Sequence, residues 1–582
     1  MKFRSFFTIL MVGVLVLLLV GAGGFLGLRS KSSLSLAQAA TQLQPEAAIF
    51  VPKQAPIMAS LLVSAESLET FRVAAAPAGQ RRRARAELAQ LEKSILAPTG
   101  LTYADDIQPW LGDEVTFAVT ASDLDRNRDN GLQPGYLLAV ATQDPNRSRE
   151  FLQLFWQKRA VSGKNLVFEQ YSGVKLIYAE SPQLSSVDSQ SPPPSTLTPI
   201  PTLSSAVVGD RFILFANHPK VLRDAITNVQ APGLNLTSSS RYQNSLQNLP
   251  SSGIGLTVIN LPELATWLGT STDTPLPDGA AAGTYDSLVV ALQLDRRGIV
   301  GETALLTAPD ETLTASRPVL SRPAGALQFI PSISPVVASS VDLQSFWTQL
   351  SDELSDGNRV SGFVNQVLNG LQDRWNLNVS KDVFRWVTRE YAIALMPRPD
   401  QAEPDWIFVA EKSADATKGI DQLDAIAKRQ GLSVGPIMLD EQEVVAWTQL
   451  SAAMPASSRR SKAQGTVALS ADVQGVHTSV GRYEIFATSV DAMNQALGAS
   501  DDSILSSDEF QQAIAPIANS NDGYLYVDWT SIRDAVKQRL PLTGIVEAVG
   551  KPFFDHWRSI TVSGYGSKAN MRRGVVFIRL QD

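Results

Sequence analysis

The stretch DIQPWLGDE, residues 106–114, occurs a second time as DVFRWVTRE, residues 382–390. In both stretches an aspartate, a tryptophan and a glutamate stand at the same spacing, and a strand-like apolar run follows, at 115–119 and at 391–395. A landmark that recurs in this way indicates that one folding unit is encoded twice, and repeats decide a fold before any single element does.

Other landmarks also occur twice and in the same order. They are a Phe-x-Pro entry into a strand at 50–52 and 329–331, an aromatic-rich strand at 210–216 and 481–487, a helix start at 239–242 and 507–510, and a strand ending in Asn or Asp at 256–260 and 524–528. We therefore predict a tandem duplication, with a first repeat over residues 47–315 and a second over residues 322–582. Each repeat is near the upper end of the size of one domain.

Short strand-like runs follow one another closely in each repeat, among them 204–208, 405–411, 466–470 and 476–480, with helical segments between some of them. Asp144-Pro145 is a typical helix start, because aspartate caps free amide groups and proline fits the first helical position. Asn260, Asp342 and Asp528 each end a strand and are expected to cap a following helix. The pattern predicts an α+β fold: two similar lobes with mainly antiparallel sheets and packed helices.

One apolar segment precedes the two repeats. Phe6–Leu28 is uncharged and long enough to cross a bilayer as a helix. We predict that residues 1–31 form an N-terminal transmembrane anchor, or an uncleaved signal, and that residues 32–46 form a polar tether. Ala37-Gln38-Ala39 has the small-x-small form that signal peptidases prefer, so cleavage near Ala39 is the alternative. The anchored layout implies a single-pass protein of the inner or thylakoid membrane, with its body in the periplasm or lumen.

Composition excludes several classes of function. The 582-residue chain has a net charge of −7, and its first 31 residues hold four bases and no acid, so the remainder carries −11. An acidic body argues against nucleic-acid binding, which needs a basic face toward phosphates. The chain has no cysteine, which excludes thiol nucleophiles, thiolate metal sites, iron–sulfur clusters and disulfides.

Motifs for catalysis are missing as well. The chain has three histidines, His218, His477 and His556, and none stands in a metal-binding spacing. There is no nucleophile elbow, phosphate-binding loop or dinucleotide fingerprint. We identify no catalytic and no cofactor-binding residues, and we expect a protein that is not an enzyme.

A polar loop near residue 125 is a candidate calcium site, because alternating oxygen ligands can converge on one hard cation. The four candidate ligands are Asp123, Asp125, Asn127 and Asp129. The loop departs from the EF-hand pattern, because Arg128 replaces the turn glycine and Pro134 the bidentate glutamate. The alternative is a polar hairpin loop that turns at Asn130-Gly131. Apart from possible calcium, no cofactor is expected.

Two loops at corresponding places in the repeats have low-complexity sequences. Residues 181–202 are rich in Pro, Ser and Thr, and residues 451–465 are rich in Ala, Ser and basic residues. Such compositions cannot bury a core, so both segments are expected to be flexible surface loops.

Two further motifs have both a functional and a structural interpretation. A basic helix begins at residues 81–85 with four arginines and continues with Leu88, Leu91 and Ile95, a pattern that suits either an anionic lipid surface or a solvated helix face. The repeated carboxylates beside Trp110 and Trp386 could form two equivalent sites. We expect instead that the tryptophans pack and that the acids cap or pair.

With these features in place, the chain resembles a family of exported cyanobacterial proteins defined only as a domain of unknown function (DUF3352). The resemblance is carried by the single N-terminal span, by the Phe50-Val51-Pro52 entry into the first strand, and by the block from Asp106 to Glu114. It covers nearly the whole chain after residue 45. It implies an envelope location and supplies no catalytic residues.

Three hypotheses follow for function. The first is a non-enzymatic binding or assembly factor that acts on a protein or lipid partner at the membrane surface. The second is an envelope hydrolase with an unrecognised site, and the third is a structural spacer. The first is the preferred interpretation, because a duplicated pair of lobes is expected to form a cleft or groove at its interface, where ligands commonly bind, while no catalytic motif is found.

Overall fold

A computed structural model of the chain describes a large part of both predicted repeats. The described residues are 41–63, 102–127, 132–161, 163, 165–179, 203–267, 285–309, 311–345, 382–398, 404–453, 468–533 and 557–580. The predicted anchor, most of the tether, the basic helix and nearly all of the two low-complexity loops lie outside these residues. Within the described residues, no helix is long and apolar enough to cross a membrane.

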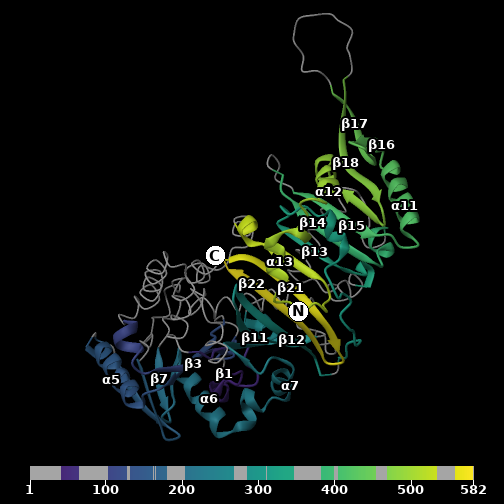
Figure 1. Cartoon of the computed structure of the whole chain (residues 1–582). Coiled ribbons are helices and arrows are strands. Elements are labelled where there is room, and N and C mark those ends of the chain that lie inside the picture. Colours follow the sequence, from purple (N-terminus) through teal and green to yellow (C-terminus); the bar gives the residue numbers. More distant parts are fainter. Residues whose placement is uncertain are drawn as a thin grey trace, which may run out of the picture. The chain divides into compact units, whose positions relative to one another are not determined.

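The chain divides into two compact units (Figure 1). Unit 1 comprises Met1–Leu313, Leu542–His556 and Leu580–Asp582, and unit 2 comprises Thr314–Pro541 and Trp557–Arg579. Helices and antiparallel strands are mixed in both, so the α+β class with mainly antiparallel sheets is confirmed.

Unit 1 is built on an antiparallel sheet with the order β12–β11–β10–β2–β3–β4–β8–β7–β6–β5. A separate two-stranded pair joins β1 and β9. The elements of this unit are β1 (Thr41–Gln42), η1 (Glu46–Phe50), β2 (Ile57–Leu61), η3 (Tyr103–Ile107), β3 (Leu111–Ala121), β4 (Gly135–Thr142), α5 (Pro145–Val161), β5 (Leu166–Tyr171), β6 (Val174–Ala179), β7 (Ser204–Val208), β8 (Phe212–Ala216), α6 (Pro219–Gln230), η5 (Pro232–Leu234), η6 (Leu236–Ser238), α7 (Ser240–Asn248), β9 (Ser252–Gly253), β10 (Gly255–Asn260), α8 (Leu261–Trp267), β11 (Tyr285–Asp295) and β12 (Gly298–Thr307).

Unit 2 has an antiparallel sheet with the order β21–β20–β13–β14–β15–β19–β18–β17–β16. Its elements are η7 (Gly325–Phe329), β13 (Val336–Val341), η9 (Phe384–Trp386), β14 (Glu390–Met396), β15 (Asp405–Glu411), α11 (Ala416–Arg429), β16 (Ser433–Leu439), β17 (Gln442–Ala453), β18 (Ala468–Val480), β19 (Tyr483–Ala487), α12 (Val490–Gly498), η10 (Ile504–Ser506), α13 (Asp508–Ile514), β20 (Tyr524–Asp528), β21 (Trp557–Lys568) and β22 (Met571–Leu580). The two sheets can be compared by matching β13 of unit 2 to β2 of unit 1. The nine strands from β21 to β16 in unit 2 then stand in the same order as the nine strands from β11 to β5 in unit 1.

Helices cover both faces of the sheet at its β5 end. In unit 1, α5 packs with Ile213 and Val140, whose side chains share one face of the sheet. Neighbouring residues of a strand point to opposite faces of the sheet. Glu169 and Tyr178 therefore lie on the other face, where α6 forms hydrogen bonds with both side chains. In unit 2, α11 packs on the face that includes Phe486.

A buried glutamate fixes the start of the sheet in unit 1. The Glu114 carboxylate, at the beginning of β3, accepts hydrogen bonds from the backbone N–H groups of Glu46 and Ala47, both at 2.9 Å, and from the Thr116 hydroxyl, also at 2.9 Å. The first N–H groups of a helix have no partner within the helix, so Glu114 satisfies two donors of η1. Burial raises the pKa of Glu114 above its usual range.

Glu390 has the same position in unit 2. Its carboxylate accepts from the Gly325 backbone N–H at 2.8 Å, at the start of η7, and from the Tyr483 hydroxyl at 3.3 Å. The following aromatic contacts also correspond, because Phe50 meets Phe212 edge-on at 5.3 Å and Phe329 meets Tyr483 edge-on at 5.4 Å. Each unit therefore holds its first short helix against the sheet through one carboxylate and one aromatic pair.

The expected helix caps are present. Asp144 accepts from the backbone N–H groups of Asn146 and Arg147, and Asn260 accepts from that of Glu263 at 3.2 Å. Asp342 and Asp528 likewise accept from the backbone N–H groups two or three residues further on. The sequence prediction did not include four of the described strands. They are β5 and β16, each at the edge of a sheet, and the two-residue strands β1 and β9.

We expect Glu114→Ala to destabilise unit 1 by about 2–4 kcal/mol, because two backbone N–H groups in a buried site lose their acceptor. Glu390→Ala is expected to cost less, about 1 kcal/mol, since one backbone N–H depends on it. Urea unfolding of the full chain, followed by tryptophan fluorescence, measures both. Equal effects of the two substitutions would contradict the capping role.

Candidate functional site

The repeated Asp–Trp–Glu landmarks form structural sites in both units. The indole N–H of Trp110 donates to the Asp106 carbonyl at 2.7 Å, and that of Trp386 donates to the Asp382 carbonyl at 3.2 Å. Both indoles are buried in the cores under α5 and α11. Since Glu114 caps η1, the structural interpretation of the landmark is confirmed.

The described part of the calcium loop uses its carboxylates to close the loop. Asp123 accepts from the Gln133 backbone N–H at 3.2 Å, and Asp125 accepts from the Gln133 side-chain amide at 3.0 Å. Asp125 also accepts from the backbone N–H of Asn127 at 2.9 Å. Asp129 lies outside the described residues. Within the part of the chain that the structure describes, no three His, Asp or Glu side chains gather to hold a metal. Calcium binding therefore stays a prediction.

The described histidines contribute to the fold. His218 caps α6, because its Nδ1 accepts from the Lys220 backbone N–H at 3.1 Å. Burial, followed by the nearby Arg223 charge, lowers the pKa of His218, so its neutral form persists to lower pH. His556 lies outside the described residues.

His477 belongs to a buried cluster in unit 2. Its Nε2 lies 3.0 Å from Oδ1 of Asp424 on α11, and the same oxygen accepts from the Trp447 indole N–H at 2.7 Å. The imidazole stacks on Phe486 at 5.3 Å between ring centroids. A histidine–aspartate pair can act as a base when it faces a substrate. Here the imidazole lies under α11 among aromatic rings, so the cluster ties the helix to the sheet.

The largest group of perturbed ionisable side chains in the described residues lies between α6 and the β5–β6 hairpin. Arg223 binds Glu169 through two hydrogen bonds of 2.7 and 2.8 Å, and the Tyr178 hydroxyl donates to Glu169 at 3.0 Å. Hydrogen bonding from Arg223 lowers the pKa of Glu169, and bonding to Glu169 raises that of Arg223. Burial and Glu169 raise the pKa of Tyr178.

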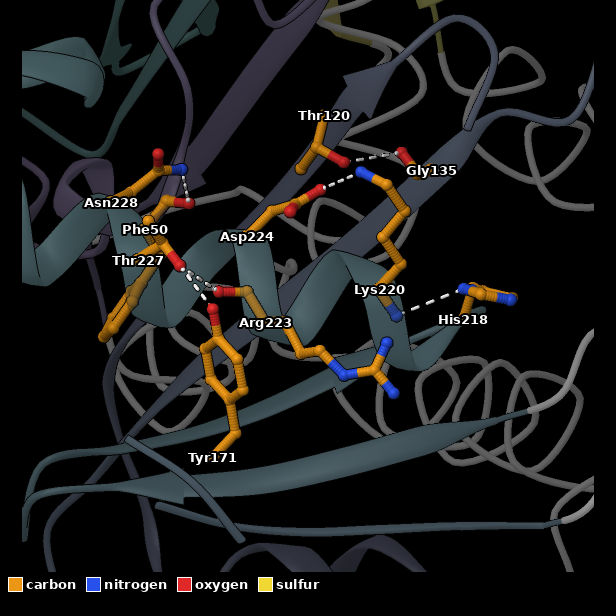
Figure 2. Close-up of polar contacts among 10 residues, drawn as sticks. All are labelled: Phe50, Thr120, Gly135, Tyr171, His218, Lys220, Arg223, Asp224, Thr227 and Asn228. Carbon is orange, nitrogen blue, oxygen red and sulfur yellow. Dashed lines mark hydrogen bonds and ion pairs between the residues drawn. The ribbon is translucent and has the colours of Figure 1, made fainter. Parts of the chain in front are cut away.

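Figure 2 shows how α6 spreads its polar contacts along its length. At one end Lys220 pairs with Asp224. Further along, Thr227 meets the Tyr171 hydroxyl at 3.1 Å, and the Asn228 amide donates to the Phe50 carbonyl at 3.0 Å. These contacts link α6 to the hairpin and to η1.

This arrangement suits a structural role better than catalysis. A general base needs a pKa near the working pH, but the pKa of Glu169 is moved in the opposite direction. Both carboxylate oxygens are already bonded to Arg223, and one also to Tyr178. We infer that the cluster stabilises the edge hairpin against α6.

The exposed flank of α5 has a different composition. Leu154 and Val161 are 51% and 84% exposed, and they lie seven residues apart, so they share one flank of the helix. Arg147, Glu150 and Lys158 lie on the same flank by the same spacing rule and are exposed. The Arg159 guanidinium, by contrast, covers the Phe155 ring at 3.8 Å. Exposed apolar and charged side chains, two basic and one acidic, thus share this flank.

The corresponding helix of unit 2 lacks such a flank. On α11 the exposed positions are held by polar or charged side chains, among them Lys418, Asp421 and Lys428. None of the exposed large hydrophobic residues in the described chain lies on α11. The two helices have equivalent positions in their sheets, so the fold does not require the exposed apolar side chains of α5.

The sequence prediction found the landmarks and caps but not these clusters. Glu169 and Arg223 are separated by 54 residues, and Asp424 and His477 by 53, so local periodicity could not pair them. One signal was available for α5, because Leu154 and Val161 fall on the polar side of its apolar pattern.

At neutral pH we expect Glu169→Gln to lower the free energy of unfolding by at most about 1 kcal/mol, because the ion pair is partly exposed. The pKa of Glu169 is lower in the folded than in the unfolded chain, so its contribution is present above about pH 4.3 and is lost as the pH falls through the folded-state value. The difference between the two proteins in urea unfolding should therefore shrink as the pH falls below about 4.3 and vanish once Glu169 is protonated in the folded chain. Asp224→Asn, in an exposed pair of the same helix, is the control and should change stability by less than about 0.5 kcal/mol. A Glu169→Gln effect that persists unchanged at acidic pH would contradict the ion-pair role.

Comparisons with known proteins give a family but no activity. No curated protein matches the sequence. Among solved structures, the chain is similar to crystal form I of TP0453, with 12% identity and a TM-score of 0.23 over 46% of this chain and 81% of that one. It is also similar to crystal form IV, with 11% identity and the same TM-score over 47% and 83%. Such scores carry no argument about function. The family model described as "Protein of unknown function (DUF3352)" matches residues 10–580, and the chain belongs to this family.

Proposed function

We propose that this chain is a membrane-anchored, exported protein that binds at a membrane surface without transforming what it binds. In this proposal its body is a tandem duplication of one lobe, which lies in the periplasm or a lumen. The duplication is supported by the shared strand order, by the two capping glutamates and by the two aromatic pairs.

The exposed flank of α5 carries the proposal. An amphipathic helix binds an anionic bilayer when apolar side chains enter the headgroup boundary and basic side chains meet lipid phosphates. Leu154 and Val161 supply the apolar contacts, and Arg147 and Lys158 supply charge. From Pro145 to Val161 the helix has four basic residues and one acid. This charge is opposite to that of the chain as a whole.

A short tether would keep unit 1 near the bilayer. If Phe6–Leu28 spans the membrane, the chain from Arg29 to Ala40 extends by at most roughly 40 Å. The next residues, Thr41–Gln42, pair with Ser252–Gly253 in unit 1. Unit 1, which carries α5, would then be held beside the membrane.

The contacts of the clustered polar side chains favour binding over catalysis. Within the described residues, the clusters around Glu114, Glu169 and His477 bond to parts of their own unit. Each cluster connects a helix to the sheet. A hydrolase would need a base or nucleophile that faces a substrate, and none of these groups does.

A fluorescent label tests this proposal directly. We expect a dye on Val161→Cys, in the full chain reconstituted into anionic vesicles, to be quenched by doxyl lipids, because the helix flank lies at the headgroup boundary. The chain has no cysteine of its own, so the label is unique. Quenching should decrease in neutral vesicles and at high salt, where the electrostatic attraction is lost.

The matched control is a dye on Lys418→Cys, on the exposed surface of α11. This label should be quenched little in either lipid. Equal quenching at the two positions, or no quenching of Val161→Cys in anionic vesicles, would contradict lipid docking by α5.

A further inference from the structure

The strands β5 and β16 each have one side without a partner among the described strands. The neighbour of β5 is β6, and the neighbour of β16 is β17. The two strands are equivalent, because each forms a hairpin closed by a two-residue turn, at 172–173 and 440–441. An open strand edge presents backbone donors and acceptors to any other strand, so proteins usually block it.

Pairing registers show which backbone groups point outward. In an antiparallel ladder, alternate residues exchange both hydrogen bonds with their partner, and a two-residue turn is flanked by such a pair. Tyr171 and Val174 flank the first turn, so the backbone groups of Leu166, Phe168 and Gln170 point to the open side. By the same argument, the backbone groups of Val434, Pro436 and Met438 in β16 point to the open side.

The residue at the centre of the three outward-pointing positions differs between the two edge strands. In β16 it is Pro436, which has no backbone N–H to offer, a common way to block an edge strand. In β5 it is Phe168, which keeps its N–H and has a side chain that is 60% exposed. The Lys175 ammonium lies 5.0 Å from the Phe168 ring centroid and covers one face of it. The edge of unit 1 is therefore open where the edge of unit 2 is blocked.

We propose that β5 pairs antiparallel with β5 of a second copy of this chain, across a two-fold axis at Phe168. This inference goes beyond the proposed function and does not depend on it. The six residues of β5 would then continue the sheet from one copy into the other.

The strand is complementary to itself in this register. Phe168 lies opposite its own copy, and Leu166 lies opposite Gln170, so the outward groups make about six main-chain hydrogen bonds. Two Phe168 rings on the same face form an aromatic pair, a favourable cross-strand contact. On the other face Glu169 lies opposite Val167, so no like charges oppose each other. Arg223 already neutralises Glu169.

The contact is small, so a copy in dilute solution would pair only weakly. A second copy is nevertheless a partner present at the same concentration and with the same edge. Covalent trapping detects such a weak contact, and the chain allows it cleanly because it has no cysteine.

Single cysteines in the full chain test the register. Opposed residues of a hydrogen-bonded pair have Cα atoms about 5.5 Å apart, within the range for a disulfide. Phe168→Cys should therefore give a cross-linked dimer under mild oxidation. Leu166→Cys should give at least several-fold less, because the two copies of residue 166 lie four residues, or about 13 Å, apart along the strand. The double variant Leu166→Cys/Gln170→Cys should restore the dimer.

Equal cross-linking of Phe168→Cys and Leu166→Cys would overturn the proposal, as would no cross-linking of Phe168→Cys together with none of the double variant. A backbone control adds Gln170→Pro to Phe168→Cys, which removes one outward N–H. The cross-linked fraction should then fall several-fold, whereas Gln170→Thr, which keeps that N–H, should leave it unchanged. An unchanged fraction with proline would also overturn strand pairing.

Discussion

The carboxylate of Glu114 and the first N–H groups of η1 form the contact on which the order of unit 1 depends. η1 leads directly into β2, the strand that lies between β10 and β3 in the sheet. Because Glu114 opens β3, one side chain fixes both the start of β2 and the position of its neighbour. The hydroxyl of Thr116 extends the network to Ser60 at 2.7 Å, on β2 itself. Glu390 repeats the arrangement for η7, β13 and β14 in unit 2.

Much of this could be predicted from the sequence where the determinants are local. The strands at 204–208 and 405–411 have the predicted bounds, because their apolar runs are short and face buried surfaces on both sides. Caps were predictable for the same reason, since a side-chain oxygen acts within three residues of the helix start. β18 was expected as two short strands at 466–470 and 476–480. It is one strand, because polar residues such as Asp472 are tolerated in an exposed part of a hairpin.

The rest could not be predicted because it depends on contacts distant in sequence or on edges without a buried face. β16 contains Gly435-Pro436, which argues against a strand except at a sheet edge. β5 contains Glu169, which lies half-buried against an arginine 54 residues away. The same distinction applies to the candidate sites. The landmark around Trp110 was visible as a repeat, whereas the Asp424–His477 pair and the exposed flank of α5 need the fold before they can be recognised.

The sheets of the two units share one strand order and differ in their exposed elements. Unit 1 has exposed large apolar side chains on α5 and, among the described strands, an open edge at Phe168, whereas α11 has no exposed large apolar side chain and Pro436 blocks the edge of β16. The most direct measurement of this difference is amide hydrogen exchange of the full chain in membranes at low and high protein density. Our account predicts that amides of Leu166, Phe168 and Gln170 become protected at high density while those of Val434 and Met438 do not change. Exchange that is independent of density at both edges, or equal protection of both, would contradict it.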